Sequence, residues 1–324
     1  MESFKNIKFV GFPDILKNGI ITSWADSKDS LLFSKLKLVI FFNYFDFLNI
    51  DLHNFNVLIL WEPKAVIPWQ YKNNILNKFD LIIPVGKLRG SKFASRNFIE
   101  HPYSYVFHEI GKGTRSKDIV MINANKFSAE KSSNYGLRRK VSIELSELPL
   151  VYDLYGPDWK VSKIKELRAR WGAIRRSVRS VNFPDFHESL SHLFHKYSEY
   201  KGLADNKIQI LSKYKFNLVI ENESDWITEK IYDSIVAETV PLYFGMDLDT
   251  YPELNNCSIQ LPRNISKINE FIRSLVFNPG LIYEEKLNNI RNLKNNKNFW
   301  YQLSYSAISE NIVSLIFKNL KSKF

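Results

Sequence analysis

Side chains that could bind a nucleotide are concentrated in one polar stretch of the sequence, residues 221–230. An aromatic ring, a cation and hydrogen-bonding carboxylates on a single loop are more typical of a nucleotide site than of a protein core. The candidate binding residues in this stretch are Glu221, Asn222, Trp226, Thr228, Glu229 and Lys230.

The elements that would position this stretch can be predicted from the residues on either side of it. Residues 216–220 are a short apolar run of strand formers, and the polar residues 221–225 end it. Thr228 can cap a following helix, and residues 240–244 predict a second strand that ends at Gly245. Because ligands bind beyond the carboxyl ends of the strands in an open parallel α/β sheet, we expect the polar stretch at that edge.

Several short motifs follow one another within this segment. They are Tyr214-Lys215-Phe216, Glu221-Asn222, Trp226-Ile227-Thr228-Glu229-Lys230, and Val240-Pro241 through Gly245. In this order they resemble the donor-binding motif of the α1,3/1,4-fucosyltransferases, which transfer fucose from GDP-fucose to a sugar hydroxyl. So many ordered matches are more specific than one three-residue pattern. The family usually has Tyr or Phe at the position of Trp226.

The resemblance implies a role for each residue of the polar stretch. Glu229 would accept hydrogen bonds from both ribose hydroxyls, although a first-turn Glu also simply stabilises its helix. Lys230 would hold the diphosphate together with N–H groups of the helix start. Trp226 would lie against the guanine, with a place in the core as an equal alternative. Glu221 and Asn222 would shape the loop and meet the sugar, although Asn is also an ordinary turn residue.

A second candidate for the diphosphate follows the strand expected at 119–123. The family has an asparagine at the end of such a strand and then a phosphate-binding arginine. Asn125 and Arg138 occupy these places, and Arg139 is adjacent. The residues alone favour a different interpretation, in which the basic run 138–140 is the solvated face of a helix.

Glu62 is the candidate for a general base. It directly follows a predicted buried strand, residues 57–61, and partial burial against Trp61 would raise its pKa toward neutrality. On the residues alone, a solvated carboxylate at a strand end is the more common case. The resemblance favours the base, because the family's N-terminal segment has a Glu in this setting that serves as one.

Length and pattern predict two domains in this chain of 324 residues. Apolar strands alternate with helical or polar stretches, which is typical of parallel α/β sheets. We expect an α/β fold with two Rossmann-like domains facing across a cleft, which is also the fold that the resemblance implies, called GT-B. The expected parts are an acceptor-side domain at 1–115, a GDP-sugar-binding domain at 116–300 and a C-terminal helix at 301–324.

Composition limits the compartment and the partners. The single cysteine, Cys257, excludes an internal disulfide framework and fits a reducing compartment. No apolar run approaches the roughly 18 residues that span a bilayer, and the N-terminus lacks the apolar stretch of a signal peptide. Since animal members of the family carry a membrane anchor, we expect a bacterial-type cytoplasmic enzyme. The net charge of +11 favours acidic partners, namely nucleic acid, anionic lipid or a diphosphate donor.

Residues 160–179 combine lysines and arginines with apolar residues at helical spacing. A basic amphipathic helix of this kind can lie on the anionic inner face of a membrane or hold an anionic glycolipid acceptor. The solvated face of a packed helix is the more common alternative.

The sequence predicts no cofactor and no protein-bound catalytic metal, with divalent cations at most stimulatory. Asp247-Leu248-Asp249 matches the pattern by which another transferase fold holds a metal-bound diphosphate, but short acidic pairs are common and we expect a loop there.

Taken together, the sequence predicts an inverting transferase that moves fucose from GDP-fucose to a glycan or glycolipid acceptor. An α1,3 linkage on a surface polysaccharide or lipopolysaccharide is expected. One alternative is a transferase of the same fold that uses another nucleotide sugar, since specificity depends on few contacts. The other is a basic nucleic-acid-binding protein, which no recognised binding motif supports.

Overall fold

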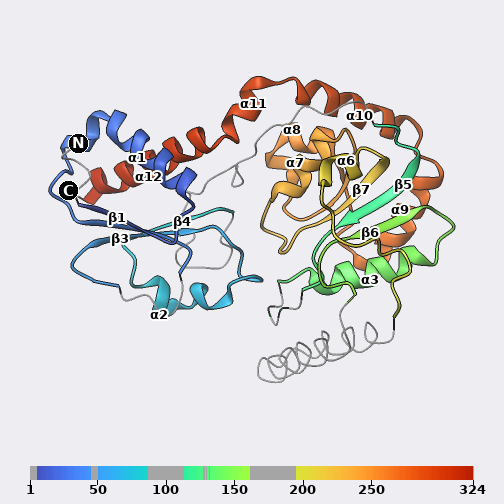
Figure 1. Ribbon diagram of the computed structural model, residues 1–324, viewed down its shortest axis with the longest axis horizontal. Helices are drawn as coiled ribbons and strands as arrows, with labels where there is room; N and C mark the ends of the chain where they lie inside the picture. The colour runs from blue at the N-terminus through green and yellow to red at the C-terminus, as the bar shows by residue number, and fades with distance from the viewer. Residues whose placement is uncertain are drawn as a thin grey trace. The chain divides into compact units, whose positions relative to one another are not determined.

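Two compact units, each built on a parallel sheet, make up the described part of the chain (Figure 1). The first unit holds the described residues up to 86, the segment 225–227 and the residues from 297 onward, and the second unit holds the others. The predicted α/β class with two Rossmann-like units is confirmed. The computed structural model describes residues 6–44, 50–86, 113–126, 128, 130, 132–160 and 195–323.

The first unit contains a four-stranded parallel sheet in the order β1-β2-β3-β4. Its middle strands are almost continuously apolar, as expected of a parallel sheet that helices cover on both faces. The side chains of β2 and β3 are buried on either face. The strands are β1 (Ile7–Val10), β2 (Leu38–Phe42), β3 (Phe55–Leu60) and β4 (Leu81–Pro84).

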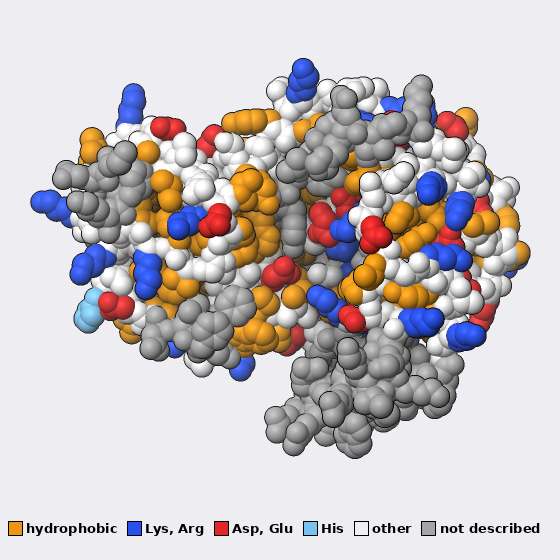
Figure 2. All heavy atoms as spheres, in the orientation of Figure 1, with side chains coloured by type: hydrophobic (Ala, Val, Ile, Leu, Met, Phe, Trp, Pro, Cys, Tyr) orange, Lys and Arg blue, Asp and Glu red, His pale blue; other side chains and the backbone are white. Residues whose placement is uncertain are grey.

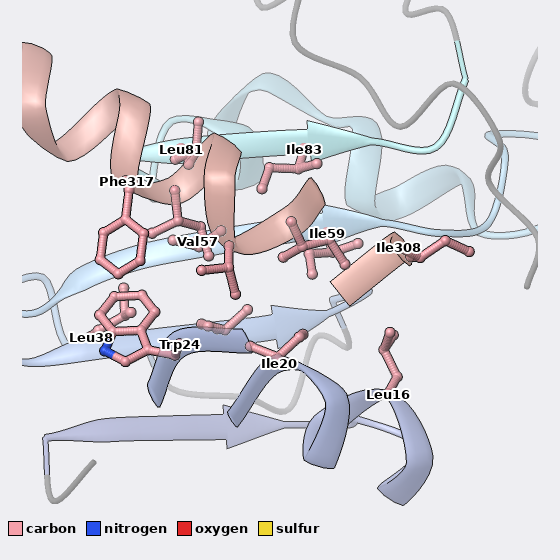
Figure 3. Packing of buried hydrophobic residues seen from close by; sticks show 14 of the residues in the cluster. Leu16, Ile20, Trp24, Leu38, Val57, Ile59, Leu81, Ile83, Ile308 and Phe317 are labelled. Atoms are coloured by element: carbon pink, nitrogen blue, oxygen red, sulfur yellow. The ribbon is translucent and has the colours of Figure 1, made fainter. Parts of the chain in front are cut away.

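Two helices from opposite ends of the sequence cover one face of this sheet. They are α1 (Asp14–Asp26) and α12 (Tyr305–Lys323), which pack against each other. Figure 3 shows their apolar side chains directed at alternate residues of the strands. The rings of Trp24 and Phe317 lie 4.3 Å apart between centroids. The C-terminal segment 301–324, which we expected as a separate part, therefore completes the core of the first unit.

The other face of the sheet is covered by a short helix, α2 (Asn73–Leu76), on the opposite side from α1 and α12 (Figure 1). A 3-10 turn, Pro68–Tyr71, comes before α2 and does not continue into it, because Lys72 between them has an extended backbone.

The second unit contains a five-stranded parallel sheet in the order β6-β5-β7-β8-β9. The chain passes from β5 to β6 on one side and then crosses to β7 on the other side of β5. Ligands bind in α/β sheets where the strand order reverses in this way. The strands are β5 (Lys117–Ile122), β6 (Tyr152–Tyr155), β7 (Tyr214–Ile220), β8 (Val240–Phe244) and β9 (Ile259–Gln260).

The helices of the second unit pack on its sheet and on one another. Asn217 of β7 donates a hydrogen bond to Ser234 of α7 at 2.8 Å, which fixes α7 on one face. Contacts also join α6 to α7, α3 to α9, and α8 to α10. The bounds are α3 (Tyr135–Ser146), α6 (Lys207–Leu211), α7 (Glu229–Val236), α8 (Pro252–Cys257), α9 (Ile268–Phe277) and α10 (Gly280–Lys294), with α11 (Lys297–Gln302) before α12. Within the described residues, no helix has both the length and the apolar character to cross a bilayer.

The substitution Phe317→Ala should destabilise the first unit, because the ring is buried against Trp24 and its removal leaves a cavity. We expect the free energy of unfolding to fall by about 3–5 kcal/mol in a denaturant titration. The control is Tyr301→Ala, whose side chain is 55% exposed and which should change stability little. Equal stability of both variants would show that α12 is not part of this core.

Candidate functional site

A cavity of about 250 Å³ lies in the second unit where β5 and β7 end. This is the reversal point of the strand order, so the topology alone marks it as the candidate site. The residues that line it are Ile122, Asn123, Ala124, Lys126, Tyr135, Arg138, Gly156, Pro157, Lys207, Asn222, Glu229 and Lys230. The predicted site residues brought together here are Arg138, Asn222, Glu229 and Lys230.

The carboxylate of Glu221, just after β7, is fully buried behind the start of α7. It accepts hydrogen bonds from the backbone N–H (2.8 Å) and the hydroxyl (2.6 Å) of Thr228, and it pairs with the ammonium of Lys230 at 3.2 Å. A buried charge is stable only when it is paired and hydrogen-bonded. Glu221 therefore fixes the first turn of α7 and is not among the residues that line the cavity.

Thr228 stands at the N-cap position of α7, but its side chain does not cap the helix as the sequence suggested. Its hydroxyl donates to Glu221 and accepts from the Lys230 ammonium at 2.6 Å. The buried carboxylate is the stronger acceptor, so it takes the hydroxyl proton. Thr228 is buried and acts on the site by holding Lys230.

Gly245, after β8, is needed for this arrangement. A Cβ atom at this position would lie 2.7 Å from Cγ of Glu221 and 2.5 Å from the hydroxyl of Tyr243. Only glycine leaves room for the buried carboxylate beside the strand end. This explains in physical terms why the sequence motif ends in glycine.

Lys230 and Glu229 present opposite charges at the cavity wall. The Lys230 side chain is 14% exposed and is held by Glu221 and Thr228. The Glu229 carboxylate lies 3.7 Å from Lys207 and 3.9 Å from Lys230. Burial acts to raise the pKa of Glu229, but Lys230 and Lys207 outweigh it, so the pKa lies below its ordinary value. Glu229 is therefore ionised at neutral pH and can only accept hydrogen bonds.

Arg138 is 1% exposed and borders the cavity from α3. Its guanidinium donates to the carbonyl of Ile220 at 2.6 and 3.0 Å and to Oδ1 of Asn222 at 2.8 Å, and it lies over the ring of Tyr135. Burial lowers the pKa of Arg138 to about 10, so it remains a cation at neutral pH. The alternative of a solvated helix face is excluded for Arg138, and Arg139 is buried as well.

Asn125 is not among the residues that line the cavity, although the sequence placed it in the site. Its amide donates to the carbonyl of Asp158 at 3.2 Å and accepts from Arg139 at 3.5 Å, so it supports the loop after β5. Asn123, two residues earlier, lines the cavity instead. Which of the two asparagines lines the cavity depends on where β5 ends and how the backbone turns after it, and the sequence does not reveal this.

Trp226 lies in the core of the first unit and not at the cavity. Its indole is 2% exposed and donates a hydrogen bond to the carbonyl of Trp61 at 3.3 Å. Of the two alternatives weighed for this residue, the structure shows the core placement. A guanine contact by Trp226 finds no support in this geometry.

Glu62 follows β3 in the first unit and is partly buried. Its peptide is unusually well fixed: Oδ1 of Asn43 accepts from its N–H at 3.1 Å, and Gln70 and Tyr71 donate to its carbonyl at 3.0 and 2.7 Å. Asn43 has a φ of 57°, a strained conformation that this network maintains. A carboxylate on so rigid a backbone suits a chemical role.

Residues that the sequence did not select complete the cavity wall. Lys207 reaches it from α6, Tyr135 from the start of α3, and Lys126 from the loop after β5. No local pattern links them to the motif in 214–245, since only the fold brings them together. The basic segment 160–179, apart from Lys160, lies outside the described residues.

The DxD pattern has a local structural role. Oδ1 of Asp247 accepts from the N–H of Asp249 and caps a 3-10 turn, Leu248–Thr250. Among the residues that the structure describes, no three His, Cys, Asp or Glu side chains gather as metal ligands would. The prediction that no catalytic metal is bound is not tested by this.

Comparison with known proteins connects the site to a family. The family model described as "Glycosyltransferase family 10 (fucosyltransferase) C-term" matches residues 158–271, which include the motif around α7. An α-(1,3)-fucosyltransferase, FucT, of Helicobacter pylori is 31% identical over 113 residues, which are 32% of this chain and 23% of that protein. The predicted resemblance to the fucosyltransferase family is confirmed.

Two solved structures are also similar to this chain. A crystal structure of an α1,3-fucosyltransferase with GDP is 14% identical with a TM-score of 0.48, covering 96% of this chain and 90% of that one. The pneumococcal O-GlcNAc transferase GtfA, in complex with UDP and GlcNAc, is 14% identical with a TM-score of 0.48, covering 87% of this chain and 57% of that one.

The substitution Thr228→Val should destabilise the second unit, because it deprives the buried Glu221 carboxylate of a hydroxyl donor. We expect the free energy of unfolding to fall by about 1–3 kcal/mol in a denaturant titration. Thr228→Ser keeps the hydroxyl and should retain most of the stability. If the Val and Ser variants were equally stable, the hydroxyl would not be holding the carboxylate.

Proposed function

We propose, from the match of residues 158–271 to the family 10 fucosyltransferase model, that this protein is an inverting glycosyltransferase. It transfers L-fucose from GDP-fucose to a hydroxyl of a glycan or glycolipid, with an α1,3 linkage. The observation that carries the proposal is the cavity at the strand reversal, where Lys230 and Arg138 face the same space as the ionised Glu229.

The cations suit the diphosphate of the donor. The Lys230 ammonium is held by Glu221 and Thr228, and the Arg138 guanidinium by Ile220 and Asn222, so both stand in fixed positions before a ligand arrives. Fixed donors stabilise charge that develops on a leaving group without needing to reorganise. In the transfer, this charge develops on the departing GDP as the bond to the sugar breaks.

Glu229 suits the ribose. An ionised carboxylate accepts hydrogen bonds and donates none, and the two neighbouring ribose hydroxyls both donate. Lys207 and Lys230 hold the carboxylate in its charged form. The Glu229 carboxylate would also repel the diphosphate, so we place it at the ribose and the cations at the phosphates.

The chemistry requires a base and no covalent intermediate. The acceptor oxygen attacks the anomeric carbon from the face opposite the diphosphate, the bond from that carbon to the phosphate oxygen breaks, and GDP leaves with the electron pair. The acceptor proton passes to a carboxylate, for which we propose Glu62. Its backbone is held by Asn43, Gln70 and Tyr71, which fixes the point from which the carboxylate extends.

A second nucleotide-sugar donor is the remaining alternative, because cations and a ribose-binding carboxylate fit any nucleoside diphosphate sugar. Nucleic-acid binding is not favoured: on the described part of the face drawn in Figure 2, Lys and Arg side chains are interspersed with Asp and Glu and do not form one band. We further propose that no cofactor is needed, that divalent cations are at most stimulatory, and that residues 160–179 contact an anionic membrane or acceptor.

Calorimetry with GDP, GDP-fucose and UDP-sugars tests the donor site. Lys230→Met should weaken GDP binding roughly 10- to 100-fold, the effect of losing a hydrogen bond from a charged group. Glu229→Ala should also weaken GDP binding, because the ribose hydroxyls lose their acceptor. The control is Lys215→Met, since Lys215 is paired with Asp118 on the same unit and does not line the cavity. Equal affinity of the Lys230 and Lys215 variants for GDP would contradict the donor site.

Transfer assays with Glu62→Gln test the base. The variant should bind GDP-fucose with unchanged affinity but lose transfer by about 10²–10⁴-fold, the range typical of a missing general base. Asp26→Asn, an exposed carboxylate of the same unit, is the matched control and should keep full activity. Undiminished transfer by the Glu62 variant would reject the assignment.

A further inference from the structure

Asn123 is a buried polar residue whose side chain makes no hydrogen bond to the part of the chain that the structure describes. It follows β5, is 4% exposed and lines the cavity. Neither its amide oxygen nor its amide nitrogen has a hydrogen-bond partner among the described residues. A buried amide without partners destabilises a fold, so such a group points to a role other than stability.

The backbone of Asn123, in contrast, is held firmly. Its N–H donates to the carbonyl of Tyr155 at 3.0 Å, and its carbonyl accepts from the Trp159 indole at 2.6 Å. Gly156 has a φ of 127° and lies so close that a Cβ there would be 2.2 Å from the Asn123 carbonyl oxygen. The structure thus fixes where the side chain starts while leaving its amide uncommitted. The amide loses no internal hydrogen bond when it turns toward a ligand.

The chemistry of an amide limits what that ligand group can be. A phosphate oxygen only accepts hydrogen bonds and would leave the amide oxygen unpaired. The amide needs a neighbouring donor and acceptor, as the edge of a heterocyclic base offers. Ile122, beside Asn123 in sequence, and Gly156 and Pro157, which follow its backbone partner Tyr155, form an uncharged part of the cavity wall. The charged groups that line the cavity lie on α3, α6 and α7, with Lys126 on the loop after β5, and suit the phosphates and ribose.

We propose that Asn123 reads the base of the bound nucleotide, its amide oxygen accepting from guanine N1–H and its amide nitrogen donating to O6. The inference rests on the proposed function, which supplies the nucleotide. Trp226, which the sequence placed against the guanine, is buried in the core of the first unit. Asn123 would provide the contact to the base instead. Asn123 is therefore a residue that contributes to the affinity for the bound nucleotide.

Two measurements on Asn123→Leu test this, with Asn123→Ala as a smaller replacement. Thermal unfolding should occur at the same or a higher temperature, because an unpaired amide is removed. Calorimetry should show GDP bound about tenfold more weakly, the effect of losing two neutral hydrogen bonds.

The matched control is Asn217→Leu. Asn217 is also 4% exposed and lies on the adjacent strand β7, but its amide donates to Ser234 at 2.8 Å. This variant should unfold at a lower temperature and bind GDP as the unsubstituted protein does. The opposite pattern, with Asn123→Leu less stable and unchanged in GDP affinity, would assign Asn123 a structural role and overturn the inference.

Three further outcomes separate the sources of error. A loss of affinity confined to GDP-fucose, with GDP unaffected, would place the amide at the sugar and overturn the assignment to the base. Unsubstituted protein that binds no nucleotide would overturn the proposed function together with this inference. If the unsubstituted protein binds GDP and the Asn123→Leu variant binds it equally well, the inference is overturned and the proposed function is not.

Discussion

The carboxylate of Glu221 has no exposure to solvent, and the arrangement of the site depends on how its charge is satisfied. Its partners are the backbone N–H and hydroxyl of Thr228 and the ammonium of Lys230, all from the first residues around the start of α7. Because leaving a charge buried and unpaired is strongly unfavourable, the start of this helix cannot move away from the end of β7 without a large loss of stability. Gly245 leaves the space that the carboxylate occupies.

The same constraint orders the charges at the cavity. Lys230 is drawn toward Glu221, and Glu229, the residue before it, lies beside Lys207 at the cavity wall. On the facing side, the carbonyl of Ile220 at the end of β7 holds Arg138. Both cations are thus fixed by groups at one strand end, and a ligand with a diphosphate would meet donors that are already oriented. In this respect the site resembles other electrostatic sites that are arranged before binding.

The sequence predicted the site best where its residues are close together in the chain. Glu229 and Lys230 follow the end of β7 within ten residues, and a strand end followed by a helix start places such residues at the ligand edge in a parallel α/β sheet. Lys207 and Asn123 come from distant elements, so only the strand order brings them to the cavity. The parallel sheets were predictable from apolar runs, whereas α1 was not, because few of its side chains are buried.

Trp226 shows why a residue in a functional motif need not touch a ligand. The segment 225–227 leaves the second unit and enters the core of the first, where a Cβ on Gly86 would lie 2.8 Å from the indole ring. Its large apolar surface is satisfied by that core, and nothing local in the sequence distinguishes this from a stacking position. Thr228 likewise had the right residue type for a helix cap, yet the nearby buried carboxylate determines what its hydroxyl does.

A crystal structure of the protein bound to GDP would test the central claim most directly. The account predicts diphosphate oxygens within hydrogen-bond distance of the Lys230 ammonium and the Arg138 guanidinium, with the ribose hydroxyls donating to Glu229 and the Glu221–Thr228 hydrogen bonds unchanged. GDP bound elsewhere, or bound in this cavity with Lys230 turned away from the phosphates, would contradict it.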